Sequence, residues 1–251
     1  NVIVIGSNGA NNYYSNLLQF LPRVFFINNK KTKIAIHRNS STKFREFIKL
    51  ILNKKNIDFS FIYLDDGFYK FNESQMPQFF NLTQSIKILK TLLVPGKILS
   101  DDRKIYVTRE DASYRRIVNE GDVVPVLRSK GYKVINPQLY SIDEQINIFS
   151  QADKIIAPHG SNLANIIFCK PGTHIYEIGP KFSNQYEKFF ENRYKILAEI
   201  NHLNYSRLLT DSVPVKKHAT DAKKYIDKRV LKNSNYYKNL IVKLKDIDGV
   251  E

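Results

Sequence analysis

Three arginines follow one short apolar stretch of the sequence and have the chemistry to bind a phosphate group. Arg109 comes directly after the strand predicted at residues 104–108, and Arg115 and Arg116 follow within eight residues of the chain. Open parallel sheets bind ligands beyond the carboxyl ends of their strands, and a guanidinium group pairs with phosphate oxygens through charge-assisted hydrogen bonds. The acidic residues among these arginines leave a second interpretation open, in which they form surface ion pairs that stabilise the protein little.

A turn of small residues could hold the same kind of group. A strand predicted at residues 154–157 leads into His159-Gly160-Ser161-Asn162, which opens a predicted helix. Free N–H groups at a helix start attract phosphate, and Gly160 allows the backbone to approach a ligand closely. His159 could donate to the same phosphate or to a sugar hydroxyl. The alternative is a helix capped by Ser161 beside an incidental histidine.

A carboxylate ends the next predicted strand. Glu177 closes the stretch 173–178, just before Gly179-Pro180. It could accept hydrogen bonds from a ribose, and it could equally be a buried or cap-stabilising glutamate.

Taken together, residues 104–180 resemble glycosyltransferase family 61. This family occurs in bacterial capsule and lipopolysaccharide loci and among eukaryotic xylosyl- and N-acetylglucosaminyltransferases. The matching residues stand in the family's order and spacing: Arg109, Arg115-Arg116, Asn119-Glu120, Gly131-Tyr132, Ser141, Glu144-Gln145, Phe149, Ala152, His159 to Leu163, Asn165, Phe168, Pro171-Gly172-Thr173 and Glu177.

The resemblance implies a GT-B fold, with two Rossmann-like domains facing a cleft. It also implies an inverting sugar transfer from a nucleotide-sugar donor, with no metal in the active site and no other cofactor. The C-terminal domain would hold the nucleotide, and the N-terminal domain the acceptor. The donor-binding candidates are Arg109, Arg115, Arg116, His159, Gly160, Ser161, Asn162, Asn165 and Glu177.

A second match lies near the start of the chain. The stretch from Asn12 to Arg23 is similar to the family's Asn-Tyr-Tyr-His…Asp…Leu-Pro-Arg pattern, which makes Asn12, Ser15 and Arg23 acceptor-side candidates. The chain departs from the pattern at two positions, because Ser15 stands where the family has histidine and Gln19 where it has aspartate.

This departure matters because an inverting transferase needs a general base to deprotonate the acceptor hydroxyl. The catalytic residue is therefore unassigned, with four weak candidates that we do not rank: Asp65, Asp66, Glu73 and Glu120. For Asp65 and Asp66 a solvated turn that ends in Gly67 is the simpler interpretation.

The elements that must position these residues alternate between strands and helices, which indicates an α/β fold. Strands are predicted at 1–6, 24–27, 33–37, 59–64, 104–108, 132–135, 154–157 and 173–178, and helices at 13–20, 42–52, 120–130, 141–151 and from 159 to 168. We expect three parts: a Rossmann-like acceptor domain at 1–96, a Rossmann-like nucleotide-sugar domain at 97–213, and a basic, helical tail at 214–251.

The amino-acid composition excludes several classes of protein. The 251 residues contain one cysteine, Cys169, so a disulfide framework and a cysteine-rich zinc site are excluded. None of the five histidines lies four residues from another, and no apolar run approaches the roughly eighteen residues of a membrane span. The chain has no signal-peptide pattern, and because it lacks an initiator methionine we interpret Asn1 as a trimmed or processed start. We expect a soluble protein of a reducing compartment.

The formal net charge of +15 is distributed unevenly. Residues 1–98 carry 14 basic and 5 acidic side chains, residues 99–213 carry 15 and 14, and residues 214–251 carry 10 and 5. The predicted donor domain is thus nearly neutral, while the first part and the tail hold the excess. The excess favours an acidic acceptor or an anionic membrane surface; an AT-rich genome that supplies surface lysine is the alternative.

Our main hypothesis is an inverting glycosyltransferase of bacterial surface polysaccharide biosynthesis (capsule or lipopolysaccharide). Its partners would be a nucleotide-sugar donor, expected to be UDP-linked, and a glycan or lipid-linked glycan acceptor. We place it in the cytoplasm, peripherally on the inner face of the membrane. A second hypothesis is a degenerate family member that acts as a glycan- or nucleotide-binding scaffold. A nucleic-acid-binding protein has only the charge in its favour, and we expect no nucleic acid partner.

Overall fold

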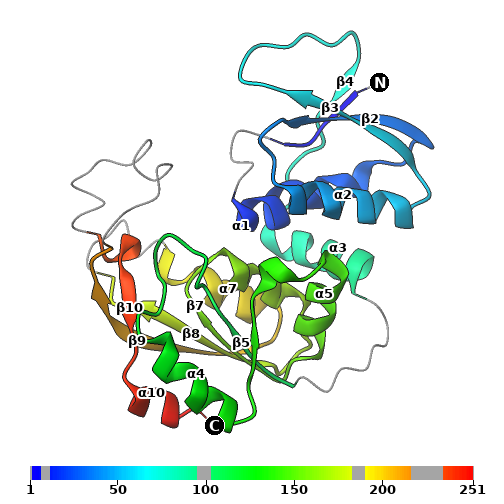
Figure 1. The fold of residues 1–251 in the computed structure, drawn as a ribbon. Coiled ribbons are helices and arrows are strands. Elements are labelled where there is room, and N and C mark those ends of the chain that lie inside the picture. The colour runs from blue at the N-terminus through cyan, green and yellow to red at the C-terminus, as the bar shows by residue number, and fades with distance from the viewer. Residues whose placement is uncertain (1, 7–11, 95–102, 183–189, 216–233, 251) are drawn as a thin grey trace. The chain divides into compact units, whose positions relative to one another are not determined.

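The computed structural model describes residues 2–6, 12–94, 103–182, 190–215 and 234–250 (Figure 1). The chain forms two compact units. The first unit comprises Asn1–Lys97 with Ile142–Ile146, and the second comprises Ile98–Ser141 with Asn147–Glu251. The boundary expected near Pro95-Gly96 lies outside the described residues.

The first unit is built on a parallel sheet of four strands. These are β1 (Val2–Val4), β2 (Lys31–His37), β3 (Asp58–Leu64) and β4 (Ser74–Gln75), in the order β3-β2-β1-β4. From β1 the chain moves outward to β2 and β3, and then returns past β1 to form β4. The sheet therefore has a topological switch point between β1 and β4, and ligands bind beyond the carboxyl ends of the strands at such points.

Helices connect these strands. The chain passes from β1 to β2 through α1 (Tyr13–Ser15), a π-helical turn η1 (Asn16–Phe20) and a 3-10 helix η2 (Leu21–Phe26); α2 (Thr42–Lys54) joins β2 to β3, and α3 (Leu82–Leu93) follows β4. The prediction of a helix at 42–52 is confirmed: Phe44, Phe47 and the apolar residues one turn further along are buried, and Ser41 Oγ accepts a hydrogen bond from the Phe44 N–H.

The predicted strand at 24–27 is wrong, because residues 21–26 form η2. A run of four apolar residues does not distinguish a buried strand from a buried helix. Pro22 sits in the first turn, where its missing N–H costs nothing and its fixed φ favours a helix. The helix predicted to stop near Pro22 therefore continues beyond it.

The second unit contains a sheet of six strands. These are β5 (Lys104–Val107), β6 (Lys133–Ile135), β7 (Lys154–Pro158), β8 (His174–Pro180), β9 (Asn204–Val213) and β10 (Asn239–Ile241), in the order β10-β9-β8-β7-β5-β6. All pairs are parallel except β9 with β10. The chain steps from β5 to β6 and then crosses back to β7, so the switch point of this sheet lies between β5 and β7.

The helical segments of the second unit follow its strands in chain order. They are α4 (Glu120–Ser129), η3 (Pro137–Leu139), α5 (Ile142–Gln151), which the division into units splits, η4 (Ser161–Phe168), α7 (Arg193–Ile200), η5 (Asn235–Tyr237) and α10 (Leu244–Asp248). Parallel strands alternating with helices confirm the α/β class predicted for the chain.

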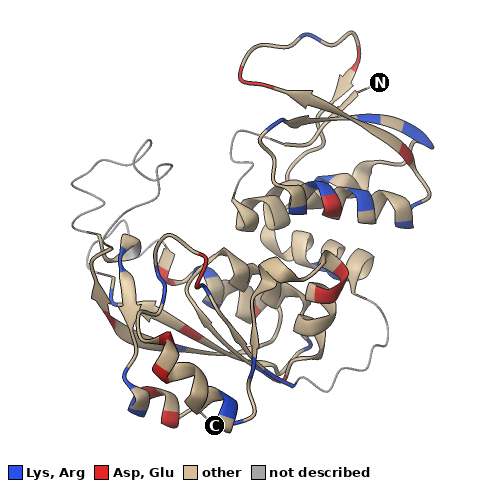
Figure 2. Cartoon of the chain, in the orientation of Figure 1, with Lys and Arg blue, Asp and Glu red and all other residues tan. Residues whose placement is uncertain are grey.

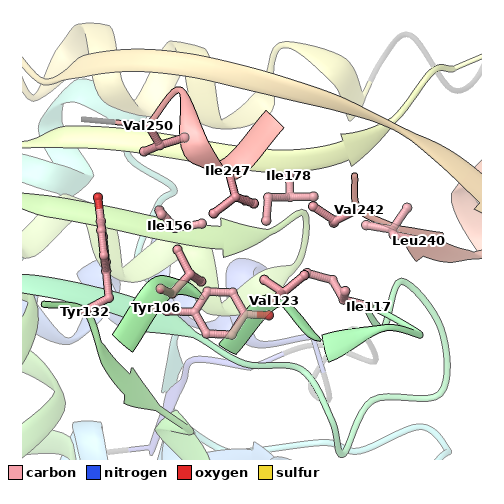
Figure 3. Close-up of a cluster of buried hydrophobic side chains, with 11 residues drawn as sticks. Tyr106, Ile117, Val123, Tyr132, Ile156, Ile178, Leu240, Val242, Ile247 and Val250 are labelled. Carbon is pink, nitrogen blue, oxygen red and sulfur yellow. The ribbon is translucent and has the colours of Figure 1, made fainter. Parts of the chain in front are cut away.

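The prediction of a helical tail at 214–251 needs correction. Residues 216–233 lie outside the described residues, but the part from 234 onward contains the edge strand β10 and the short helix α10. Leu240, Val242, Ile247 and Val250 are buried in one cluster with Tyr106 of β5 and other core side chains (Figure 3). The many lysines of this segment conceal these buried apolar positions in the sequence.

This packing predicts a sharp difference between two neighbours in β10. Leu240 is fully buried, whereas the adjacent Ile241 is 38% exposed. We expect Leu240→Ala to lower the free energy of unfolding by about 2–5 kcal/mol through loss of burial and creation of a cavity. Ile241→Ala, the matched control, should lower it by less than about 1 kcal/mol. Urea denaturation of both variants measures this, and equal effects would contradict a core role for the C-terminal segment.

Candidate functional site

Arg109 lies at the carboxyl end of β5, two residues beyond Val107, and is 9% exposed. Its guanidinium group rests against the backbone of Gly160, which follows β7. A Cβ atom on Gly160 would lie only 1.8 Å from Nη1 of Arg109, so this approach requires glycine at position 160. Since β5 and β7 flank the switch point, Arg109 stands where a sheet of this topology binds its ligand.

Arg115 is held in an unusual backbone conformation in the loop between β5 and α4, which we call the arginine loop. Its φ of 58° lies in the left-handed region, which costs a non-glycine residue roughly 1–2 kcal/mol. The surrounding structure fixes this conformation, since the Arg115 N–H donates to the carbonyl of Lys238 at 2.9 Å. The side chain is 4% exposed, with Cζ 4.8 Å from the centre of the Tyr114 ring.

The C-terminal segment therefore positions the arginine loop as well as filling the core. The Leu240 N–H donates to the carbonyl of Arg116, and the Val118 N–H donates to the carbonyl of Leu240, both at 2.8 Å. The side chain of Arg116 is exposed, in contrast to that of Arg115. Of the two adjacent arginines, the structure thus brings only Arg115 into the buried site.

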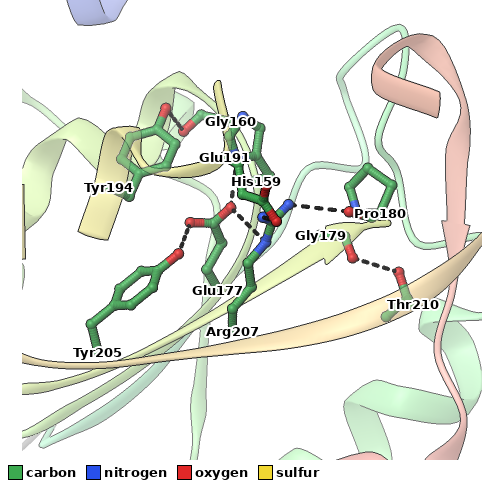
Figure 4. A network of polar contacts seen from close by, with 10 residues as sticks. All are labelled: His159, Gly160, Glu177, Gly179, Pro180, Glu191, Tyr194, Tyr205, Arg207 and Thr210. Carbon is green, nitrogen blue, oxygen red and sulfur yellow. Dashed lines mark hydrogen bonds and ion pairs between the residues drawn. The ribbon is translucent and has the colours of Figure 1, made fainter. Parts of the chain in front are cut away.

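A buried hydrogen-bond network continues from β7 into β8 and β9 (Figure 4). His159 Nδ1 lies 2.5 Å from Oε1 of Glu177, and the hydroxyl of Tyr205 donates to Oε2 of Glu177 at 2.6 Å. His159 is 1% exposed and Glu177 is fully buried. Both oxygens of Glu177 are thus engaged within the protein, which leaves this carboxylate poorly placed to accept hydrogen bonds from a ribose.

Burial decides the charge of this pair. It lowers the pKa of His159 to about 4, and the nearby positive charges of Arg115 and Arg207 act in the same direction against the pull of Glu177. Burial alone would raise the pKa of Glu177, but His159, Arg207 and Tyr205 together hold it below its usual value. At neutral pH a neutral His159 donates from Nδ1 to an ionised Glu177.

Arg207 is a site residue that sequence reasoning missed. Its Nη1 lies 3.1 Å from Oε1 of Glu191, its Nε lies 3.7 Å from Oε1 of Glu177, and its Nη2 donates to the carbonyl of Pro180 at 3.1 Å. The ring of Phe182 stacks beneath the guanidinium group, 4.6 Å from Cζ. Tyr205 and Arg207 are two residues apart in β9, so both side chains lie on the same face of the strand, toward Glu177. This spacing of two was the only feature of the sequence that could have indicated Arg207.

The turn after β7 differs in one detail from the prediction. Gly160 occupies the N-cap position of η4, and no side chain makes the capping hydrogen bond there, so Ser161 does not cap this helix. The carbonyl of Gly160 instead accepts a hydrogen bond from the hydroxyl of Tyr194 at 2.7 Å. Ser161 and Asn162 are partly exposed at the start of η4, while Asn165 is fully buried.

The electrostatic balance of this cluster favours an anion. Among the described residues of the cluster, Arg109, Arg115 and Arg207 contribute three positive charges, while His159 is neutral and Glu177 is the fully buried carboxylate. Glu191, on the edge of the cluster, is 39% exposed. An excess of buried guanidinium groups at the carboxyl ends of parallel strands suits a phosphate or diphosphate group.

Sequence comparison now bears on this geometry. The sequence model described as Glycosyltransferase 61 matches residues 3–176, which is well over half of the chain. The chain belongs to glycosyltransferase family 61. It is therefore a glycosyltransferase. No curated protein matched the chain.

In this glycosyltransferase the weak candidates for the base lie in different surroundings. Asp65 forms two hydrogen bonds with Arg38, at 2.7 and 3.1 Å, and this pairing lowers its pKa and makes it a weaker base. Asp66 is exposed, 3.1 Å from Nε2 of His37. Glu73 is exposed before β4.

The fourth candidate, Glu120, lies in the second unit at the start of α4. Its Oε1 accepts hydrogen bonds from the hydroxyls of Tyr106, at 2.5 Å, and Thr108, at 2.7 Å. These bonds tie α4 to the end of β5, which is a structural role.

The acceptor-side candidates of the first unit also differ in their exposure to solvent. Asn12 is the N-cap of α1, and its Oδ1 accepts a hydrogen bond from the Ser15 N–H at 3.2 Å. Asn12 is exposed, whereas Arg23 is 2% exposed. Among the described residues no group of three or more His, Cys, Asp or Glu side chains is arranged to hold a metal ion.

The neutral His159 predicts an acid-sensitive fold. In the unfolded chain a histidine binds a proton near pH 6.5, whereas folded His159 does so only near pH 4. Between these values the unfolded chain binds more protons, so stability falls as the pH falls, by about 2–3 kcal/mol for this group. The lowered pKa of Glu177 adds to the loss only below its usual value of 4.5.

Thermal unfolding followed from pH 7 to pH 4.5 measures this effect. His159→Gln, which can still donate to Glu177 but does not titrate, should show a weaker pH dependence than the wild type. His174→Gln is the matched control, since His174 is exposed, and it should retain the wild-type dependence. A wild type equally stable at both ends of this range would contradict a buried neutral His159.

Proposed function

We propose that the second unit binds the diphosphate of a nucleotide-sugar donor and that the enzyme transfers the sugar, with inversion, to a glycan acceptor. The observation that carries this proposal is the placement of Arg109 at the β5–β7 switch point, with Arg115 and Arg207 near neutral His159. Arg109 and Arg115 are buried and Arg207 is 11% exposed, and these three positive charges outnumber the negative charges of Glu177 and Glu191. This excess suits a leaving group that gains negative charge.

The proposed transfer is a direct displacement at the anomeric carbon of the donor. An acceptor hydroxyl attacks the anomeric carbon, a new carbon–oxygen bond forms, and the bond from that carbon to the diphosphate oxygen breaks with its electron pair going to the nucleoside diphosphate. The hydroxyl proton passes to a general base. Guanidinium groups preorganised around the diphosphate stabilise its charge more in the transition state than in the bound donor.

His159 and Glu177 act in this proposal as positioning residues. Glu177 fixes the orientation of the imidazole through Nδ1, and the hydroxyl of Tyr205 fixes Glu177 in turn. A neutral imidazole in this place adds no fourth positive charge that the protein would have to bury.

The first unit would bind the acceptor in a GT-B arrangement. Its parallel sheet has a switch point of its own, and lysine and arginine positions recur along α2 and β2, whereas basic and acidic positions are mixed in the second unit (Figure 2). Residues 1–98 carry an excess of nine basic over acidic side chains, from 14 and 5. This charge suits an anionic or lipid-linked glycan at the inner face of a bacterial membrane, in capsule or lipopolysaccharide synthesis.

The arginine cluster is tested by calorimetric titration with nucleoside diphosphates, uridine diphosphate first. We expect Arg109→Ala and Arg207→Ala each to weaken binding by about 10- to 100-fold, since each removes charge-assisted hydrogen bonds. Arg103→Ala is the matched control, because Arg103 precedes β5 at the opposite end of the strand, is 61% exposed and pairs with Asp153. It should bind as tightly as the wild type.

The glycine beneath Arg109 offers an independent variant for the same titration. Gly160→Ala should displace the guanidinium group and weaken binding, whereas Gly121→Ala, where the added carbon meets no atom within 4 Å, should not. Binding to no nucleoside diphosphate, or equal binding by the Arg109, Arg207 and Arg103 variants, would refute the donor site. Tight binding without turnover on any donor–acceptor pair would favour the scaffold hypothesis instead.

Membrane association is tested separately by sedimentation with vesicles. None of the helices in the described part of the chain combines the length and apolarity that crossing a bilayer requires. We expect binding to vesicles that contain anionic lipid, reduced by salt and absent with purely zwitterionic vesicles, because the attraction is electrostatic. Binding that is indifferent to anionic lipid and to salt would contradict a charge-driven peripheral association.

A further inference from the structure

Arg23 bridges the carboxyl ends of two strands in the first unit. Its Nη1 donates to the carbonyl of Ile5, one residue beyond β1, and its Nε donates to the carbonyl of Pro77, two residues beyond β4, each at 2.6 Å. These two strands flank the switch point of the sheet. Arg23 thus occupies the same topological position in the first unit as Arg109 does in the second.

The charge of Arg23 lacks a balancing carboxylate. The side chain is 2% exposed, and within the described ranges no aspartate or glutamate lies within ion-pair distance of it. Burial lowers the pKa of Arg23, and no carboxylate acts against this effect; an arginine nevertheless stays protonated at neutral pH. A buried charge without a partner is costly, so its presence calls for a compensating anion.

One edge of the guanidinium group is available for that anion. Nη2 is buried and makes no hydrogen bond, whereas Nη1 and Nε are both engaged by carbonyls. The group that lies over the guanidinium is the ring of Phe79, with its centre 4.5 Å from Cζ. Phe79 is itself 58% exposed, so the cover over this face of the guanidinium group is a surface side chain.

We propose that Arg23 binds an anionic group, a phosphate ester or a carboxylate, at the β1–β4 switch point of the first unit. The anion accepts hydrogen bonds from Nη2 and neutralises the buried charge, while the two carbonyls hold the guanidinium in place. Assigning this anion to the glycan acceptor rests on the proposed function. The existence of the anion site does not, and it is tested without any transfer reaction.

The probe is the Nε–H signal of Arg23 in protein labelled with ¹³C and ¹⁵N, assigned by through-bond correlation to the Arg23 backbone. Methyl phosphate and glucuronate are titrated separately, with glucose as the uncharged control. We expect a saturable shift with at least one anion and none with glucose. The anion that saturates at the lower concentration identifies the source as a phosphate ester or an acidic sugar. The Arg38 signal, from an exposed arginine paired with Asp65, should not move.

Three variants test this site, and the first separates it from the donor site. In Arg109→Gln the shift of the Arg23 signal should persist although nucleoside diphosphate binding is weakened. Phe79→Ala, which keeps Arg23 but removes its cover, should tighten anion binding several-fold, and Arg23→Lys should weaken it by about tenfold because lysine lacks the planar fork.

An Arg23 signal that neither anion moves, or a shift that vanishes in Arg109→Gln, would overturn the proposal. The wild-type and Phe79→Ala titrations decide the matter even if Arg23→Lys does not fold. If no anion moves the Arg23 signal but nucleoside diphosphate still binds, only the anion site is refuted. If an anion moves the Arg23 signal but no nucleoside diphosphate binds, only the donor site is refuted.

Discussion

The hydrogen bond between His159 and Glu177 determines how charge is distributed in the second unit. Because burial keeps His159 neutral, the imidazole occupies the centre of the site without adding a charge, and Glu177 stays ionised. One fully buried carboxylate does not neutralise Arg109, Arg115 and Arg207 together, and Glu191 lies at the partly exposed edge. The excess positive charge therefore comes from the arginines alone, and the neutral histidine keeps it from growing further.

The same constraint of topology operates in both units. In each sheet the order in which the chain adds strands reverses at one point, between β1 and β4 in the first unit and between β5 and β7 in the second. At each point a buried arginine lies across the carboxyl ends of the strands, supported by backbone: Gly160 beneath Arg109, and the carbonyls of Ile5 and Pro77 beside Arg23. In the proposed function, transfer from a nucleotide sugar to an acidic glycan requires two anionic groups to be held, and the arginine in each unit would hold one of them.

Much of this could be predicted from the sequence, since the helix at 42–52 and the strands around 104–108, 154–157 and 173–178 have strong local patterns. They also placed Arg109 and Gly160 just beyond strand ends, but the prediction that Glu177 ends its strand is wrong, because β8 continues to Pro180. The residues that the sequence did not reveal are placed by pairing between strands that are distant in the chain. Arg207 reaches the site because β9 pairs with β8 in a register that sets it opposite Glu177, and the buried positions of the C-terminal segment depend on its pairing with β9 and the arginine loop. Neither register is encoded in local composition.

A crystal structure with a bound nucleoside diphosphate would test the central claim most directly. We expect the diphosphate to lie at the carboxyl ends of β5 and β7, with its oxygens within hydrogen-bonding distance of Arg109, Arg115 and Arg207 and with His159 still bonded to Glu177. A diphosphate bound at any other place in the second unit, or seated on Arg23 in the first, would contradict it.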